Sequence, residues 1–253
     1  MTTIYRTSEV AKIIGLHPNT IRKYEAWGLI PQPQRLPNGY RIYTDFHVDL
    51  IKLSRKAFQI ELLHSNLRRT MVEVIKAAAK KEFISAHQQL LYYKKIIDDE
   101  LEKAQKAIEV CEELLLHKSN FFSSKAYSRK AVAELLEVSV DALRNWELNG
   151  LLQPQRQANG RRYYTSQEVN CIRIIKTLRD AKYSLEAILR MLSELQTNPD
   201  ISIADTLNHP DEQAEIISVC DQLITSLQIG KKNAQEIGSL LSDLEEKYGT
   251  VSK

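Results

Sequence analysis

The chain has 253 residues, 43% of them hydrophobic and 26% charged, which is typical of globular domains that bury a core. Its formal net charge of +3 does not by itself indicate nucleic-acid binding. Three cysteines without CxxC spacing and six scattered histidines argue against a structural zinc site and a disulfide framework. We find no phosphate loop, nucleophile–base set or paired carboxylate motif, so we expect neither an enzyme nor a cofactor. The first residues lack the apolar segment of a secretion signal, and no apolar run approaches membrane-spanning length, so we expect a cytoplasmic protein.

The charge is unevenly distributed along the chain. Residues 5–56 contain nine Lys or Arg and four Asp or Glu, and residues 125–179 contain ten and five. Each block therefore has five positive charges in excess, and the remaining segments are net acidic. Two basic blocks separated by acidic sequence indicate two separate contact regions for nucleic acid.

The two basic blocks are copies of one another. Residues up to Leu29 recur at a shift of 122, and residues from Pro33 onwards recur at a shift of 121. The first set is Tyr5, Val10, Ala11, Arg22, Glu25, Gly28 and Leu29, which recur as Tyr127, Val132, Ala133, Arg144, Glu147, Gly150 and Leu151. The second set is Pro33, Gln34, Arg35, Asn38, Gly39, Arg41, Tyr43, Thr44 and Val48, which recur as Pro154, Gln155, Arg156, Asn159, Gly160, Arg162, Tyr164, Thr165 and Val169. A period this long indicates a duplicated domain.

Each copy begins with a pair of short helices. The first copy predicts an amphipathic helix over residues 9–14, a turn at 15–17 and a second helix from Pro18 to Gly28. The second copy predicts a helix over residues 130–136, then a turn and a second helix that is capped by Ser139 and ends at Gly150. The order of elements is that of a helix-turn-helix.

A hairpin and a further helix follow in each copy. Asn38-Gly39 and Asn159-Gly160 stand between alternating apolar and polar residues, a strong signal for a tight hairpin. Thr165 and Glu168 form a capping-box pattern at the start of the next helix. The fold class expected is therefore mainly α, with two winged helix-turn-helix domains, each with a small β-hairpin wing, joined by long coiled-coil helices.

The second helix of each copy and the hairpin carry the candidate DNA contacts, because in a helix-turn-helix the N-terminal residues of the second helix face base edges in the major groove. The base-facing candidates are Asn19, Thr20 and Lys23, with Asp141, Ala142 and Asn145 at the equivalent positions. Candidates for the flanking DNA backbone are Arg22, Tyr24, Arg144 and Trp146. Candidates on the hairpin, facing phosphates or the minor-groove edge, are Arg41, Tyr43, Arg161, Arg162 and Tyr164. Tyr24 or Trp146 could equally cap the small core, and a hairpin arginine is often only a solvated charge.

These stretches resemble the signature of the MerR family. The resemblance rests on Arg22-Lys23-Tyr24-Glu25, Gly28-Leu29-Ile30 and Asn38-Gly39-Tyr40-Arg41-Ile42-Tyr43, and on Leu143-Arg144-Asn145-Trp146-Glu147, Gly150-Leu151-Leu152 and Asn159-Gly160-Arg161-Arg162-Tyr163-Tyr164. It covers residues 4–55 and 126–195. It implies that recognition helix and wing bind duplex DNA, that a long helix pairs antiparallel with that of a second protomer, and that promoter DNA is distorted. RNA polymerase at a promoter is then a further candidate partner.

The sequence departs from the family pattern in three places. After Val48 the first copy is about three residues shorter than the second, so its auxiliary helices are expected to pack differently. Lys23 and Asn145 stand where the family usually has a tyrosine, which puts one backbone contact per copy in doubt. The duplication itself is the third departure, because typical members carry one such domain per chain.

Two long helices are predicted, over residues 85–117 and 213–248. Each carries an apolar seam with alternating steps of four and three, as in a coiled coil. An antiparallel pairing in which partner numbers sum to 331 places Ile97 opposite Ala234 and Cys111 opposite Cys220. The two cysteines are either small buried residues or, as the sharper alternative, a redox or metal-sensing pair, for which the sequence offers no third ligand. We expect a single-chain pseudo-dimer, with a homodimer through these helices as the rival arrangement.

The predicted organisation is a first winged domain with auxiliary helices (1–84), a long helix (85–117), a linker (118–126), a second winged domain (127–197), a loop (198–212) and a C-terminal helix (213–248). The function expected is that of a sequence-specific transcriptional regulator. An architectural or chromosome-anchoring DNA protein is the alternative. An effector sensor is a third reading, although little of the chain remains to form a separate ligand domain.

Overall fold

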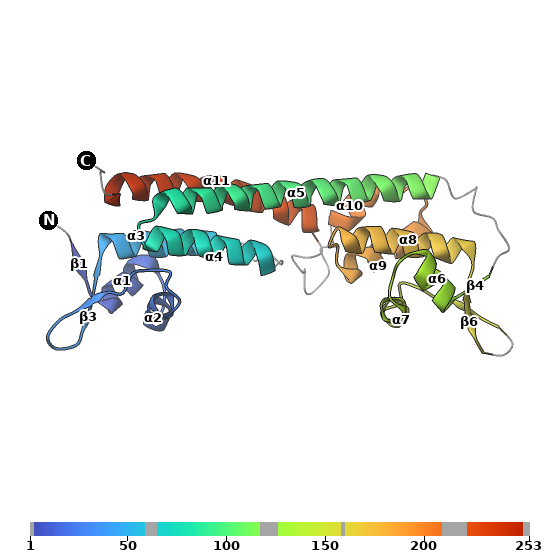
Figure 1. Ribbon diagram of the computed structural model, residues 1–253, viewed down its shortest axis with the longest axis horizontal. Helices are drawn as coiled ribbons and strands as arrows, with labels where there is room; N and C mark the ends of the chain where they lie inside the picture. Colours follow the sequence, from blue (N-terminus) through green and yellow to red (C-terminus); the bar gives the residue numbers. More distant parts are fainter. Residues whose placement is uncertain (1–2, 59–64, 117–125, 158–159, 209–221, 250–253) are drawn as a thin grey trace. The chain divides into compact units, whose positions relative to one another are not determined.

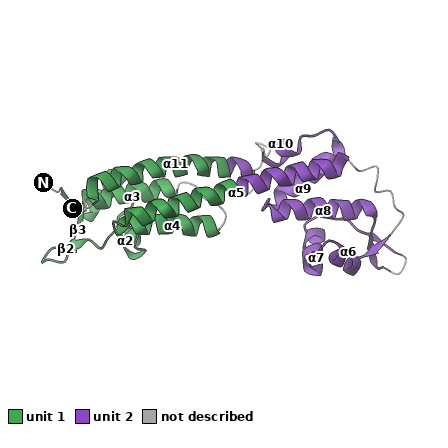
Figure 2. Ribbon diagram, turned by 45° about the horizontal axis from the view of Figure 1, so that its top comes forward, with its two compact units in different colours: residues 1–99, 227–253 green, residues 100–226 purple. Residues whose placement is uncertain are grey.

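The computed structural model describes residues 3–58, 65–116, 126–157, 160–208 and 222–249 (Figure 1). They form two compact units, coloured separately in Figure 2. Unit 1 comprises residues 1–99 and 227–253, and unit 2 comprises residues 100–226. The boundaries between the units fall within the two longest helices, α5 (Phe83–Leu116) and α11 (Leu223–Tyr248). Both units therefore draw on both long helices. No helix in the described part of the chain is long and apolar enough to cross a membrane.

The two winged domains have the same order of elements, which confirms the predicted fold class. Module one (residues 4–57) consists of β1 (Ile4–Tyr5), α1 (Thr7–Ile14), α2 (Pro18–Ala26), β2 (Gln34–Arg35), β3 (Arg41–Thr44) and α3 (Asp45–Ala57). Module two (residues 127–180) consists of β4 (Tyr127–Ser128), α6 (Arg129–Leu135), α7 (Val140–Leu148), β5 (Gln155–Arg156), β6 (Arg162–Tyr164) and α8 (Ser166–Asp180). The auxiliary helices are α4 (Ser65–Ala79) after module one, and α9 (Leu185–Thr197) and α10 (Ile203–Asn208) after module two. Helix α10 lies in the stretch 198–212 that was expected to be a loop.

Each wing is part of a three-stranded antiparallel sheet, with strand orders β1-β3-β2 and β4-β6-β5. The hairpin strands were predicted, whereas the two-residue outer strands β1 and β4 were not. Tyr5 pairs with Tyr43 in the first sheet, and Tyr127 pairs with Tyr164 in the second. The start of each module is therefore fixed to its wing.

The helix ends follow the predicted local signals. Gly28 and Gly150, each two residues after the last residue of α2 or α7, have φ values of 72° and 79°, in the left-handed region that favours glycine. Thr165 caps α8, and the Glu168 carboxylate accepts a hydrogen bond from the Thr165 backbone N–H at 2.6 Å. The equivalent residue in α3 is His47, whose Nδ1 accepts a hydrogen bond from the Thr44 backbone N–H at 3.1 Å. The capping box is thus present in both copies, with a histidine in one of them.

Helix α5 carries an apolar seam that starts earlier than predicted, at Phe83, and continues through Ile97 to Cys111, all of them buried. Within unit 1 the first half of α5 lies antiparallel to α11 (Figure 2). The predicted register would place His87 opposite Leu244, and the structure pairs it with the next residue, Glu245, at 3.0 Å. Cys220 and its expected contact with Cys111 lie outside the described residues.

In unit 1 the last turn of α11 packs against α3. The Tyr248 hydroxyl donates to the Asp49 carboxylate at 3.0 Å, and the Lys247 ammonium lies 3.5 Å from the same group. The ring of Tyr248 also packs on Phe46, with the centroids 4.8 Å apart. In unit 2 the second half of α5 lies along α8, where Asn170 donates to the Leu114 carbonyl at 3.3 Å. Each module is therefore backed by a long helix.

Candidate nucleic-acid interface

Helix α2 of module one is amphipathic, with a sharp division between its faces. Ile21 and Tyr24 are buried, while Asn19, Arg22 and Lys23 are exposed. The helix is capped by His17, whose Nδ1 accepts a hydrogen bond from the Asn19 N–H at 3.2 Å. The outward face is therefore polar and cationic, and it begins at the first turn of the helix.

Helix α7 of module two repeats this geometry with different side chains. Leu143 and Trp146 are buried at the positions of Ile21 and Tyr24. Asp141, Arg144 and Asn145 are exposed, while Thr20 and its counterpart Ala142 are half-buried. The Ser139 hydroxyl caps the helix by accepting from the Ala142 N–H at 3.0 Å. The two helices are thus equivalent scaffolds with unlike outward faces.

The wing arginines are tied to the ends of these helices. In module one, Arg41 Nε lies 2.7 Å from Glu25 Oε2, and this contact raises the pKa of Arg41 above its ordinary value. In module two, Arg162 Nη1 lies 2.8 Å from Glu147 Oε2. Glu25 and Glu147 stand at equivalent places near the ends of α2 and α7. Each carboxylate therefore joins the second helix of its module, α2 or α7, to the wing of that module.

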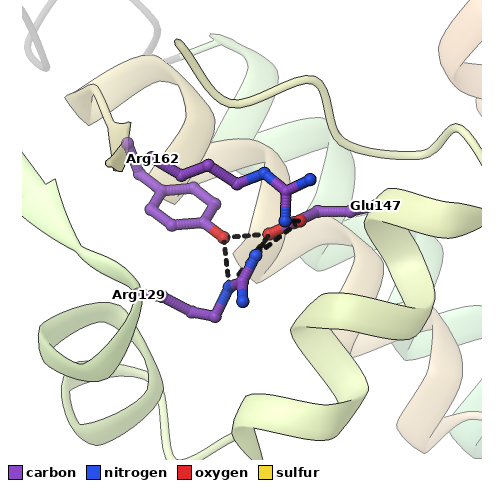
Figure 3. A network of polar contacts seen from close by, with 4 residues as sticks. Arg129, Glu147 and Arg162 are labelled. Carbon is purple, nitrogen blue, oxygen red and sulfur yellow. Dashed lines mark hydrogen bonds and ion pairs between the residues drawn. The ribbon is translucent and has the colours of Figure 1, made fainter. Parts of the chain in front are cut away.

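Module two extends this contact into a larger network, which Figure 3 shows from close by. Arg129 donates to both carboxylate oxygens of Glu147, at 2.9 Å and 2.7 Å. The Tyr164 hydroxyl also donates to Glu147, and burial together with this carboxylate raises the pKa of Tyr164. The Glu147 side chain is only 6% exposed, so three donors satisfy an almost fully buried charge. Module one has Thr7 at the place of Arg129.

The structure corrects the expectation for four aromatic residues. Tyr43 and Tyr164 have no exposed surface, and Tyr24 and Trp146 are each 7% exposed, so all four belong to the module cores. Arg41 and Tyr43 do share a face of β3, as residues two apart on a strand must. Tyr43 packs inward and stacks edge-on against His47, while Arg41 stays partly exposed and contacts Glu25. For Tyr24 and Trp146, the reading as core residues holds.

The polar site residues predicted from the sequence lie at the surface, fully or in part. Asn19, Arg22, Lys23, Asp141, Arg144, Asn145, Arg161 and Arg162 are exposed, and Thr20 and Arg41 are partly exposed. Sequence reasoning missed the role of Glu25 and Glu147, although each recurs in the repeat together with its arginine. It also left out Arg35 and Arg156, exposed residues of β2 and β5. Repetition was the signal that could have found both pairs.

Cys111 does not form a comparable site. Cys111 is fully buried in unit 2, and its thiol lies 3.9 Å from the Ile174 carbonyl. Burial raises the pKa of Cys111 to about 12, which favours the protonated thiol. Among the residues that the structure describes, no three His, Cys, Asp or Glu side chains come together as metal ligands do.

Comparison with known proteins assigns both modules to one family. The family model for "MerR family regulatory protein" matches residues 6–43, and that for "MerR HTH family regulatory protein" matches residues 127–195. HTH-type transcriptional regulator CueR of Escherichia coli O157:H7 is 49% identical over 53 residues, 21% of this chain and 39% of the relative. The mercuric resistance operon regulatory protein of Bacillus cereus is 32% identical over 76 residues, 30% of this chain and 58% of that protein.

A longer match covers about half of the chain. The uncharacterized HTH-type transcriptional regulator YyaN of Bacillus subtilis (strain 168) is 26% identical over 132 residues, 50% of this chain and 94% of that protein. The match to the CueR relatives spans 39% of their length. No solved structure matches the chain significantly. The two family matches fall on the two copies found by repeat analysis, so each copy is a MerR-type domain and the chain carries two of these domains in tandem.

Proposed function

We propose that the protein is a transcriptional regulator that binds duplex DNA sequence-specifically through α2 and α7. The observation that carries this proposal is the repeated geometry: an exposed polar helix face, joined by a buried carboxylate to an arginine on a wing. A helix of this kind fits the major groove, and the wing arginines stand beside it to contact phosphates. Two of the relatives are named HTH-type transcriptional regulators, which supports the same function.

We further propose that one chain binds DNA with its two modules, as two protomers of a typical family member do with one module each. The contacts of α5 with α11 inside unit 1 support an intramolecular pairing of the long helices. An intramolecular pairing avoids the loss of association entropy that a dimer must bear. By resemblance to the family, the paired modules would distort promoter DNA, with RNA polymerase as a further partner.

Binding to duplex DNA by fluorescence anisotropy tests the interface. Arg22→Ala with Lys23→Ala removes two cations from the outward face of α2 and is expected to weaken binding and flatten its salt dependence. Lys103→Ala with Lys106→Ala is the matched control, because it removes the same charge from exposed positions of α5. Equal affinity of the two double variants would contradict the assigned interface.

Mapping of occupied genomic sites by immunoprecipitation then separates regulation from an architectural role. A small number of promoter-centred peaks, with changed transcript levels when the protein is removed, supports a regulator. Broad coverage without changes in transcription supports the architectural alternative.

A further inference from the structure

We propose that the two modules read different base sequences, so that the preferred duplex site has two unlike halves. This inference rests on the proposed function, because it assumes that α2 and α7 both face DNA. It goes further in naming the residues that set specificity and the bases that they fit. The residues are Asn19, Thr20 and Lys23 on α2, with Asp141, Ala142 and Asn145 on α7.

The two helices can be compared position by position because their surroundings match. Each has nine residues and a side-chain cap at the preceding residue, His17 or Ser139. Each buries two apolar or aromatic residues spaced by three, and each is tied to its wing by a glutamate. A difference on the outward face is therefore a difference in what the helix presents to a ligand, since the cap, the buried residues and the glutamate behind that face correspond in the two helices.

The hydrogen-bonding groups at these positions differ in kind. Asn19 can donate to and accept from an adenine edge, whereas the Asp141 carboxylate can only accept and so fits the amino group of cytosine. Lys23 can only donate and fits the acceptors of guanine, whereas Asn145 again fits adenine. Ala142 offers only a methyl group, which fits the methyl of thymine, where Thr20 also has a hydroxyl. Two of the three positions therefore favour different bases in the two halves, and the third differs by the hydroxyl of Thr20.

The charge of the two faces differs as well. Arg22 and Lys23 give the outward face of α2 two positive charges, while Asp141 and Arg144 cancel on α7. A carboxylate near DNA is repelled by phosphates and by base acceptors, so Asp141 excludes most sequences in addition to fitting one. Asp141 would also suit the first turn of any helix through the helix dipole. The two roles predict different results when it is replaced.

Selection of bound sites from random duplex DNA, carried out with the full chain, tests the inference. The wild type is expected to enrich a site whose halves differ. A variant with Asp141→Asn, Ala142→Thr and Asn145→Lys gives α7 the face of α2, and is expected to select two like halves. Its affinity for the wild-type site should fall about 10-fold or more for each base pair that it no longer fits. The reverse variant, Asn19→Asp with Thr20→Ala and Lys23→Asn, should select two like halves of the other sequence.

The six substituted positions are exposed or half-buried, and the substitutions do not change the helix caps or the two glutamates. The helices should therefore still form, which circular dichroism can check. A symmetric site selected by the wild type would overturn the inference while leaving DNA binding in place. The inference would also be overturned if the α7 variant selected the same site as the wild type, because Asp141 would then only stabilise its own helix and would not read a base. If the wild type enriched no sequence at all, the proposed function would fail together with the inference.

Discussion

Arg162 Nη1 lies 2.8 Å from Glu147 Oε2, so the wing of unit 2 is fixed to the end of α7 by an ion pair. In unit 1, Arg41 and Glu25 make the same contact. A side chain that we propose to bind phosphate is thus already held by a carboxylate of its own module. Such an arginine is oriented before DNA arrives, which reduces the entropy lost on binding.

Replacing either wing arginine with alanine should weaken binding to all duplex sequences and reduce the log–log salt slope by about one. The two variants should differ in stability. Arg41→Ala removes the cation that Glu25 contacts, whereas after Arg162→Ala the Glu147 carboxylate keeps Arg129. Loss of the partner of a largely buried carboxylate costs about 1–3 kcal/mol. Thermal unfolding should therefore show the larger decrease for Arg41→Ala, and unchanged DNA affinity of both variants at moderate salt would contradict the role of the wings.

The stability of unit 1 should depend on the protonation of His47. This residue is 7% exposed, and burial lowers its pKa below the ordinary value of 6.5. The unfolded chain therefore takes up a proton at a higher pH than the folded chain, and stability should be lost as the pH falls below about 6.5. His47→Gln keeps a side-chain acceptor for the Thr44 N–H and cannot be protonated. Urea unfolding at pH 7.5 and pH 5.5 should show a smaller loss for the variant, and equal losses would contradict this prediction.

How much the sequence could predict varies along each module. Some features follow from local signals: the Asn-Gly pairs, the glycines after α2 and α7, and the Thr165 capping box. Those that fall on described residues form as predicted. The inward orientation of Tyr43 could not be predicted, because alternation along β3 shows that Arg41 and Tyr43 share a face without showing what covers it. Strand β1 has only two residues and no pattern of its own. It exists because the wing offers it a partner.

Cys111 should be unreactive in the native protein. Its thiol is buried, and its pKa is raised to about 12, so the thiolate that reacts with alkylating agents is scarce at neutral pH. Cys171 is partly exposed and serves as an internal comparison. Iodoacetamide labelling at pH 7.5, followed by mass spectrometry of peptides, should modify Cys171 first and Cys111 only after denaturation. Rapid labelling of native Cys111 would favour the redox alternative for Cys111 and Cys220.

A single-chain pseudo-dimer should sediment as a monomer. Sedimentation equilibrium at micromolar concentration is expected to give a mass near 29.1 kDa. A homodimer through the long helices would give twice that mass and would overturn the single-chain arrangement. Adding duplex DNA containing one selected site should then increase the mass by one equivalent of DNA for each protein chain.

The contact between Tyr248 and Asp49, 199 positions apart in the chain, has a consequence for protein synthesis. A ribosome releases the chain from its N-terminus, so module one emerges well before α11. Until α11 emerges, the apolar faces of α3 and α5 that it covers remain open to water and to other nascent chains. The first module made is thus the last to be completed, and a premature stop codon anywhere before Leu227 would leave it unfinished.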